Sequence, residues 1–258
     1  MILIVLINQI LKMKILVIGG TGLTGTNVTS KLRDAGHEVV VGVPSTGIDI
    51  ISGEGLTEAL KGTDIVIDLS NSSSPEEENA INFFRTAGKN LVTAEKAAGI
   101  KHHLVLSIVG TDRAQYIGYL RAKKEQEDNI KNSGIPYTVI RSTQFHEHVS
   151  TIIAVQSNDN VVHVSTLDYQ PIAVEDVAKY VVKFALEEPK NSTVEIAGPE
   201  RAPMDEFVKR YLTINEQNKE VVTDDENKYM FFVLPKSGLV PVGDFHSGAI
   251  YFDDWAKN

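Results

Sequence analysis

The stretch that decides the fold is Lys14–Gly25, which reads KILVIGGTGLTG. Its first five residues include a continuous apolar run, which predicts a strand buried on both faces of a parallel sheet. The glycines that follow fit two spacings. One is Gly-x-x-Gly-x-x-Gly, starting at Gly19, and the other is Gly-x-Gly-x-x-Gly, starting at Gly20. Both include Gly22 and Gly25.

Glycine at these spacings has a physical purpose. One glycine permits a turn that other residues resist, one lets the backbone approach a pyrophosphate, and one lets a helix pack close to the sheet. Free N–H groups at the start of that helix bind the anion. Because the motif stands between a predicted strand and a predicted helix, it indicates a dinucleotide-binding turn. A tight strand–helix turn that binds nothing is the alternative.

Outward from this turn, short β-branched runs alternate with helical stretches, which favours βαβ units. The predicted strands are Lys14–Ile18, Glu38–Val43, Asp64–Leu69, Leu104–Ser107, Tyr137–Ile140, Val161–Val164 and Val194–Ala197. The predicted helices are Leu23–Ala35, Gly55–Lys61, Pro75–Ala98, Tyr119–Asn132, Val174–Leu186 and Met204–Tyr211. We therefore predict an α/β fold with a Rossmann-type, doubly wound parallel sheet as a single domain over residues 13–258. A small C-terminal substrate lobe is expected from about residue 145 onward.

Composition limits the possible functions. The chain has 258 residues, 42% hydrophobic and 23% charged, which are ordinary globular values. It has no cysteine, so disulfides, thiolate zinc sites, iron–sulfur clusters and cysteine nucleophiles are excluded. A formal net charge of −9 makes a duplex-binding face a poor expectation, since such a face needs clustered lysine and arginine. No nucleic-acid partner is expected.

The apolar N-terminus, Met1–Leu11, is too short to span a bilayer, which needs about 20 residues. It lacks a basic region and a cleavage site, so it does not fit a signal peptide. Met13 is a more natural start, and we predict that residues 1–12 are a dispensable extension. A weak membrane-associating segment is the alternative. The protein is expected to be cytoplasmic, with no membrane partner.

The second strand indicates which nucleotide is bound. An NAD site usually places an acid at its end, and an NADP site places an arginine nearby. Here the strand runs into Pro44–Gly47, with neither. A 2′-phosphate meets no repelling carboxylate there, and Ser45 and Thr46 have hydroxyls to donate. NADP is therefore favoured and NAD is the alternative, unless the segment is only a turn.

Among the eight tyrosines, only Tyr119 has a lysine four residues later, at Lys123. On a helix this spacing puts both on one face. A nearby ammonium lowers the pKa of a phenol, which can then pass a proton to a carbonyl as hydride arrives. Lysine can also bond the nicotinamide ribose, and Ser107 can polarise the same carbonyl. An amphipathic surface helix is the alternative reading.

Polar residues also follow two other strands. Leu69–Ser72 comes where the adenosine half of a dinucleotide usually passes, although a plain serine-rich loop fits nearly as well. Ser142–Phe145 is expected near the nicotinamide. His146 and His148 have a spacing that does not place two ligands on one helix face, so no metal site is expected.

Taken in order, these segments resemble the atypical short-chain dehydrogenase/reductases, and as a set they are similar to the NmrA-like, NAD(P)-binding branch. The segments are Lys14–Gly25, Leu106–Arg113, Tyr119–Lys123, Gly134–Arg141, Thr143–Phe145, Pro171–Ile172, Asp176–Ala178 and Ile196–Pro199. The resemblance covers about Met13 to Trp255. Pro44 stands where many relatives carry an arginine.

The resemblance implies a Rossmann fold with NAD(P)H at the strand ends. The implied cofactor contacts, in order from pyrophosphate to nicotinamide, are Gly19, Thr21, Gly22, Leu23, Thr24, Ser45, Thr46, Ser70, Asn71, Ser107, Lys123, Thr143, Gln144 and Phe145. It suggests an NAD(P)H-dependent oxidoreductase for a small carbonyl or quinone-like substrate. Tyr119 would be the proton donor, Lys123 its pKa modifier and Ser107 the carbonyl orienter.

The branch also contains members that bind the cofactor as redox sensors, so a non-catalytic sensor that acts on a protein partner is the alternative. Isomerase or epimerase chemistry with bound NAD is a third possibility.

Overall fold

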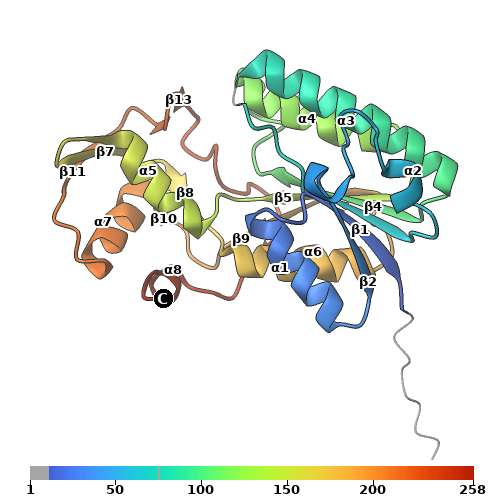
Figure 1. Cartoon of the computed structure of the whole chain (residues 1–258). Helices are drawn as coiled ribbons and strands as arrows, with labels where there is room; N and C mark the ends of the chain where they lie inside the picture. Colours follow the sequence, from blue (N-terminus) through green and yellow to red (C-terminus); the bar gives the residue numbers. More distant parts are fainter. Residues whose placement is uncertain (1–11, 75) are drawn as a thin grey trace, which may run out of the picture.

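The computed structural model describes residues 12–74 and 76–258. All but the last residue of the predicted dispensable extension, residues 1–12, lies outside the described residues. The sheet and its covering helices stand on one side of the molecule, and a smaller group of helices and strands extends from the strand ends (Figure 1).

The main sheet has seven strands in the order β14-β9-β5-β4-β3-β1-β2, and every pairing in it is parallel. The strands are β1 (Lys14–Ile18), β2 (Glu38–Gly42), β3 (Ile65–Asp68), β4 (His102–Ile108), β5 (Tyr137–Ser142), β9 (Ser192–Ala197) and β14 (His246–Ser247). The strand order reverses between β1 and β3, and ligands of open α/β sheets bind at the carboxyl ends of the strands beside such a point.

Helices cover both faces of the sheet, because the apolar residues of its strands alternate between two cores (Figure 1). The helices are α1 (Leu23–Asp34) and α6 (Val174–Leu186) on one face, and α2 (Leu56–Ala59), α3 (Glu77–Ala98) and α4 (Gly118–Lys131) on the other. In β1, Ile15 packs in the core with Leu32 of α1, whereas Leu16 packs in the core with Leu91 of α3. This two-sided burial explains why β1 is apolar without alternation.

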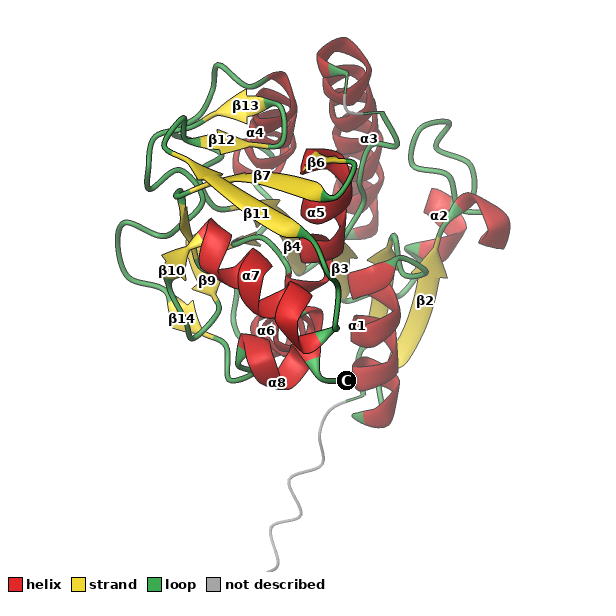
Figure 2. Cartoon of the chain, turned by 90° about the vertical axis from the view of Figure 1, so that its left-hand side faces the viewer, coloured by secondary structure: helices red, strands yellow, loops and turns green. Residues whose placement is uncertain are grey.

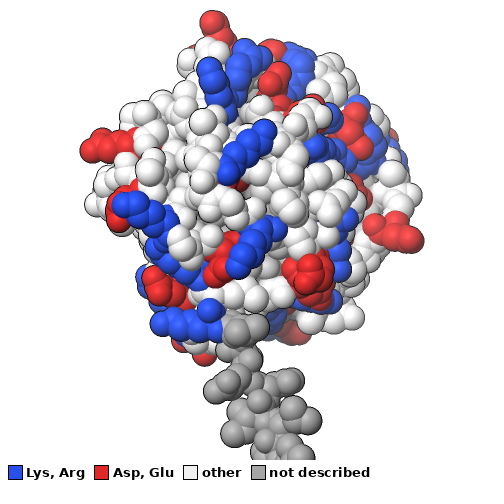
Figure 3. Space-filling model, turned by 90° about the vertical axis from the view of Figure 1, so that its right-hand side faces the viewer, with Lys and Arg blue, Asp and Glu red and all other residues white. Residues whose placement is uncertain are grey.

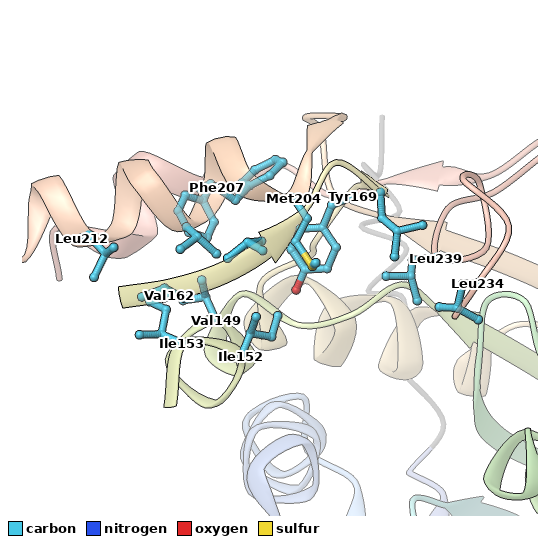
Figure 4. Close-up of a cluster of buried hydrophobic side chains, with 14 of the residues drawn as sticks. Val149, Ile152, Ile153, Val162, Tyr169, Met204, Phe207, Leu212, Leu234 and Leu239 are labelled. Carbon is cyan, nitrogen blue, oxygen red and sulfur yellow. The ribbon is translucent and has the colours of Figure 1, made fainter. Parts of the chain in front are cut away.

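The lobe faces the viewer in Figure 2. It comprises α5 (Val149–Gln156), β6 (Ser157–Asn158), β7 (Val161–Ser165), β8 (Asp168–Tyr169), β10 (Ala202–Pro203), α7 (Met204–Ile214), β11 (Glu220–Asp224), β12 (Lys228–Tyr229), β13 (Phe232–Val233) and α8 (Phe252–Ala256). Two short 3₁₀ helices, η1 (Pro44–Thr46) and η2 (His146–His148), complete the elements. The lobe has its own apolar cluster, which includes Tyr169 and Phe207 (Figure 4). Not all of the chain after residue 145 belongs to it, since α6, β9 and β14 return to the sheet.

The architecture confirms the predicted Rossmann-type α/β fold. One boundary differs in an informative way: β4 begins at His102 and not at Leu104. Both histidines are buried in the strand because each ring finds a partner there. The His102 ring lies 2.9 Å from the Thr138 hydroxyl, and the His103 ring lies 2.9 Å from the Glu95 carboxylate.

No helix within the described residues combines the length and hydropathy needed to cross a membrane. On the face opposite the lobe, basic and acidic side chains are interspersed (Figure 3).

Candidate functional site

The turn after β1 is built around glycines that leave room for neighbouring backbone. Gly19 has a φ of +73°, and a Cβ atom there would lie 2.8 Å from the carbonyl oxygen of Leu69. A Cβ atom on Gly25 would lie 2.2 Å from the carbonyl oxygen of Gly19, so α1 starts this close to the turn only with glycine. Gly22 is exposed, and its Cβ atom would meet its nearest neighbour at 3.4 Å. The backbone at Gly22 is therefore open to a ligand.

The start of α1 offers backbone donors. Within the described residues, no backbone carbonyl accepts a hydrogen bond from the N–H of Thr21, Leu23 or Thr24. The first turn of the helix carries no acidic side chain. Unpaired N–H groups and the positive end of the helix dipole favour an anion here. The arrangement fits the pyrophosphate that the sequence predicts for these residues.

The turn after β2 contains the residues predicted to meet the adenosine ribose. The Thr46 hydroxyl donates to the carbonyl oxygen of Val43 at 2.8 Å, so it shapes the turn and its proton is already used. Ser45 is exposed and is the better placed of the two hydroxyls. The Asp49 carboxylate accepts the N–H of Ile51 at 2.7 Å, within its own turn. No acidic side chain occurs within residues 43–47.

The end of β3 is fixed by a buried carboxylate that leads to the predicted adenosine contacts. Asp68 is 4% exposed. One of its oxygens accepts the N–H of Ser70 at 2.9 Å, and the other accepts the Gln126 side-chain amide at 2.7 Å. These bonds place Ser70 inside the turn and leave Asn71 exposed after it.

Asn71 and Tyr119 meet at this edge of the sheet, although they are 48 residues apart. The Tyr119 hydroxyl donates to the side-chain oxygen of Asn71. Burial raises the pKa of Tyr119, and the hydrogen bond with Asn71 lowers it by less. The sequence predicts the opposite direction, through Lys123, and this prediction is wrong because Lys123 has other partners.

The Lys123 ammonium is buried between α4 and the sheet. It donates to the carbonyl oxygen of Leu106 at 2.9 Å and to the side chain of Gln126. It also lies 4.9 Å from the ring centre of Phe84. Burial lowers the pKa of Lys123 to about 8, although nearby carboxylates act in the other direction. In this arrangement the ammonium fastens α4 to β4, and its contact with the nicotinamide ribose stays a prediction.

Ser107 belongs to a buried charge network. Its hydroxyl donates to Glu127 at 2.7 Å. Arg141 donates two hydrogen bonds to Glu127, each of 2.9 Å, and pairs with Asp112 at 2.8 Å. Burial alone would raise the pKa of Glu127, but Arg141 and Lys131 outweigh it and lower this pKa to about 2. The Ser107 proton is therefore directed to Glu127, and the network ties the loop after β4 to β5.

The residues after β5 face the lobe. Thr143 is 2% exposed, and its hydroxyl has no hydrogen-bond partner within the described part of the chain. Phe145 forms an isolated β-bridge with Ile172. The side-chain oxygen of Gln144 accepts the hydroxyl of Tyr229 at 3.0 Å. The Tyr229 contact brings the lobe to the predicted nicotinamide position.

Two observations show that these residues fit a dinucleotide. The glycine turn forms a cradle that side chains would fill, and the orphaned Thr143 hydroxyl marks an unmet hydrogen bond at the other end of the site. The main-chain donors of α1 would hold the pyrophosphate. In residues 12–74 and 76–258, no group of three or more histidines and carboxylates is arranged to hold a metal ion.

Comparison with known proteins identifies the family. The model of the NAD(P)H-binding family matches residues 19–189, about two thirds of the chain. The chain belongs to the NAD(P)H-binding family. This membership confirms the resemblance to atypical short-chain dehydrogenase/reductases, because the match begins at the glycine turn and includes β5 and α6.

Two relatives of this chain have names that describe different roles. The chain is 28% identical over 188 residues to the photosystem II assembly factor Ycf39 of Synechocystis sp., covering 66% of this chain and 58% of that protein. It is 28% identical over 145 residues to (4-alkanoyl-5-oxo-2,5-dihydrofuran-3-yl)methyl phosphate reductase of Streptomyces griseus, covering 51% of this chain and 48% of that one. The matched segment thus spans only about half of each relative's length.

Solved structures share the fold. The Bordetella bronchiseptica enzyme WbmG, in complex with NAD, has a TM-score of 0.74 and 15% identity, covering 98% of this chain and 94% of that one. UDP-glucose 4-epimerase from Thermotoga maritima has a TM-score of 0.73 and 17% identity, covering 95% and 96%. At these identities the likeness establishes the α/β architecture of this NAD(P)H-binding protein and nothing finer.

Sequence reasoning missed five side chains that shape the site: Asp68, Gln126, Glu127, Arg141 and Tyr229. A charged residue at or near the end of a strand that begins with apolar or buried residues is a usable signal, and Asp68 and Arg141 both have it. Gln126 and Glu127 follow Lys123 on the same helix, but the partners that tie them to the sheet, Asp68 and Arg141, are on other elements. No pattern in the sequence around Tyr229 indicates that it reaches the site.

Proposed function

We propose that this protein is an NAD(P)H-dependent oxidoreductase that favours NADPH and reduces a small carbonyl or quinone-like compound. The observation that carries the proposal is the meeting of Tyr119 and Asn71 at the carboxyl edge of the sheet, next to the glycine turn. A bound reduced nicotinamide would supply the hydride. The protein's own residues must hold the cofactor, orient the substrate and deliver a proton.

Tyr119 is suited to donate that proton. Its raised pKa keeps the phenol protonated at neutral pH, which is the form needed for reduction. The proton moves from the Tyr119 hydroxyl to the substrate oxygen, and solvent then reprotonates the tyrosinate. Asn71 holds the hydroxyl until a carbonyl oxygen competes for it, and so acts as a positioning residue.

The preference for NADPH rests on charge at the turn after β2. Ser45 is free to donate, and the Asp49 carboxylate is engaged with the N–H of Ile51. A 2′-phosphate would therefore meet a hydroxyl and no free carboxylate in this turn. Calorimetric titration with NADPH and NADH tests this, with tighter binding of NADPH expected. Equal or tighter binding of NADH contradicts the preference.

The test of catalysis is Tyr119→Phe. We expect turnover to fall about 10²- to 10⁴-fold, which is the usual contribution of a positioned general acid, with the cofactor dissociation constant changed less than about threefold. Tyr251→Phe is the matched control, because Tyr251 is 53% exposed and lies at the start of α8. Unchanged turnover in Tyr119→Phe removes Tyr119 from the mechanism.

A non-catalytic redox sensor is the second candidate, and one observation favours it. Lys123 is bound to Leu106 and Gln126, so the expected tyrosine–lysine pair is not assembled. One similar protein is named as an assembly factor. The sensor reading predicts unequal affinities for oxidised and reduced cofactor and no cofactor consumption with any carbonyl compound.

A further inference from the structure

A segment of the lobe crosses the strand ends next to the candidate site. We call residues 225–240 the strap; in Figure 1 it runs from β13 back toward β5. In the lobe, the Ser165 hydroxyl donates to the carbonyl oxygen of Lys228 at 2.8 Å. At the sheet, the Arg113 guanidinium donates to the carbonyl oxygens of Ser237 at 3.3 Å and Val240 at 2.8 Å. The strap is therefore anchored both to the lobe and to the loop after β4.

The strap directs one tyrosine inward. Asn227 and Met230 have positive φ values of 54° and 52°, and these two left-handed residues enclose the short strand β12. Tyr229, in β12, then reaches Gln144, two residues after β5, and its hydroxyl donates to the Gln144 side-chain oxygen at 3.0 Å. Phe231, two residues later, points outward and is 81% exposed. Burial raises the pKa of Tyr229, so its hydroxyl is neutral.

Two buried hydroxyls without hydrogen-bond partners belong to residues next to Tyr229 or Gln144. Tyr169 is 1% exposed, and its hydroxyl has no partner within the described residues, as is also true of Thr143, the neighbour of Gln144. Tyr229 packs against the apolar cluster that contains Tyr169. In Figure 4 the Tyr169 hydroxyl points toward the side of the cluster where Ile152 lies. Buried hydroxyls without partners are unmet hydrogen bonds, which a water molecule or a ligand's polar group would satisfy.

The cations around this end of the sheet are already paired. They lie on the loop after β4, on the first two turns of α4 and on β5, and they are Arg113, Arg121, Lys123, Lys124 and Arg141. Their partners are, in the same order, strap carbonyls, Glu77, the Leu106 carbonyl, Asp128, and Glu127 with Asp112. The strap's own Lys228 pairs with Glu226, and its Lys236 lies at the exposed surface. A phosphate or carboxylate would therefore compete with an existing carboxylate or carbonyl for each paired cation.

We propose that Tyr229 and Gln144 form the substrate-recognition pair and that they select an uncharged carbonyl compound over an anionic one. The inference rests on the proposed oxidoreductase function and names its substrate class. The pair offers one hydroxyl and one amide, which hydrogen-bond a neutral carbonyl without a charged partner. Exposed apolar side chains stand on the same hairpin and beside it: Phe232 pairs with Tyr229, and the Tyr116 hydroxyl donates to the carbonyl oxygen of Val233. Such side chains suit a hydrocarbon or ring.

The experiment compares two aldehydes that differ by one charge, methyl 4-formylbenzoate and 4-formylbenzoate. Cofactor affinity is first measured by calorimetry. Turnover is then followed by the loss of reduced-cofactor absorbance, as hydride adds to the aldehyde carbon and a proton to its oxygen, giving the alcohol. We expect kcat/KM for the ester to exceed that for the acid at least about tenfold, since the acid would have to displace an existing partner from each paired cation.

Tyr229→Phe separates recognition from folding. We expect KM for the ester to rise about fivefold, as for the loss of one neutral hydrogen bond, with kcat and cofactor affinity little changed. Tyr251→Phe is again the control, and circular dichroism checks that both variants fold.

Each other outcome overturns something specific. Equal kcat/KM for ester and acid, or no turnover of either by a protein that binds cofactor, overturns the substrate class. A Tyr229→Phe variant that matches Tyr251→Phe overturns the recognition pair. Failure to bind any nicotinamide cofactor overturns the proposed function itself.

Discussion

Replacing Glu127 with glutamine should destabilise the protein by about 3 to 5 kcal/mol, because it leaves the buried Arg141 guanidinium with only the half-exposed Asp112 carboxylate as a charge partner. The Glu127 side chain is 0% exposed and that of Arg141 is 7% exposed. The pKa of Glu127 is lowered from 4.5 to about 2, chiefly because Arg141 overcomes the opposing effect of burial. Each tenfold change in proton affinity corresponds to about 1.4 kcal/mol, so the ionised carboxylate stabilises the fold by about 3 kcal/mol.

The assay is urea unfolding of wild type and Glu127→Gln at pH 7, followed by circular dichroism. Asp128→Asn is the matched control, since Asp128 pairs with Lys124 on the same helix but its side chain is 42% exposed. This exposed pair should contribute less than about 1 kcal/mol. A loss below about 1 kcal/mol in Glu127→Gln, or an equal loss in the control, refutes the reasoning.

The pH dependence has a definite sign. A carboxyl whose folded pKa lies below its unfolded value stabilises the fold above the unfolded pKa, and this stabilisation is lost as pH falls. For Glu127 the loss should occur between pH 4.5 and about 2. Glu127→Gln should lack this component, so the stabilities of the two proteins should converge in acid. A constant difference across that range contradicts the assignment.

Two further predictions concern the cofactor turn and acid stability. Gly25→Ala should weaken binding of NADPH and NADH at least about tenfold in calorimetric titration, because its Cβ atom would lie 2.2 Å from the Gly19 carbonyl oxygen. Gly243→Ala, with no atom within 4 Å of its Cβ, should bind as wild type, and equal affinities for both variants contradict the argument. His146 is 1% exposed with a pKa lowered from 6.5 to about 4 by burial, so it stabilises the fold above pH 6.5 and this stabilisation is lost as pH falls. Between pH 6.5 and 5 the free energy of unfolding of the wild type should fall by about 2 kcal/mol more than that of His146→Gln, as measured by urea unfolding at each pH. An equal fall in the two proteins contradicts the role of His146.

Much of the fold could be predicted from sequence because interactions between residues close together in the chain determine it. The glycine turn needs glycine at fixed positions, since other residues would clash with the backbone at Gly19 and Leu69. The strands β1 to β5 are apolar because helices cover both faces of the sheet. Helix α6 was predicted at its observed bounds, Val174–Leu186, from its period of apolar residues.

Less of the lobe was predictable. Its strands β6, β8, β10, β12 and β13 have two residues each, too few to show any period. Their pairings depend on contacts between distant segments. The hairpin that carries Tyr229 is one example, because it forms only where the strap crosses from the lobe to the sheet.

The parallel sheet and the glycine turn at the head of its first helix can be predicted from the amino-acid order, because backbone sterics and apolar periodicity act between near neighbours. The groups that Tyr119 and Lys123 touch depend instead on how distant elements pack. Their spacing places both on one helix face, but Tyr119 meets Asn71 from the loop after β3, and Lys123 meets the Leu106 carbonyl of β4. Spacing on a helix fixes where side chains begin, whereas the elements packed against that helix fix where their polar ends find partners.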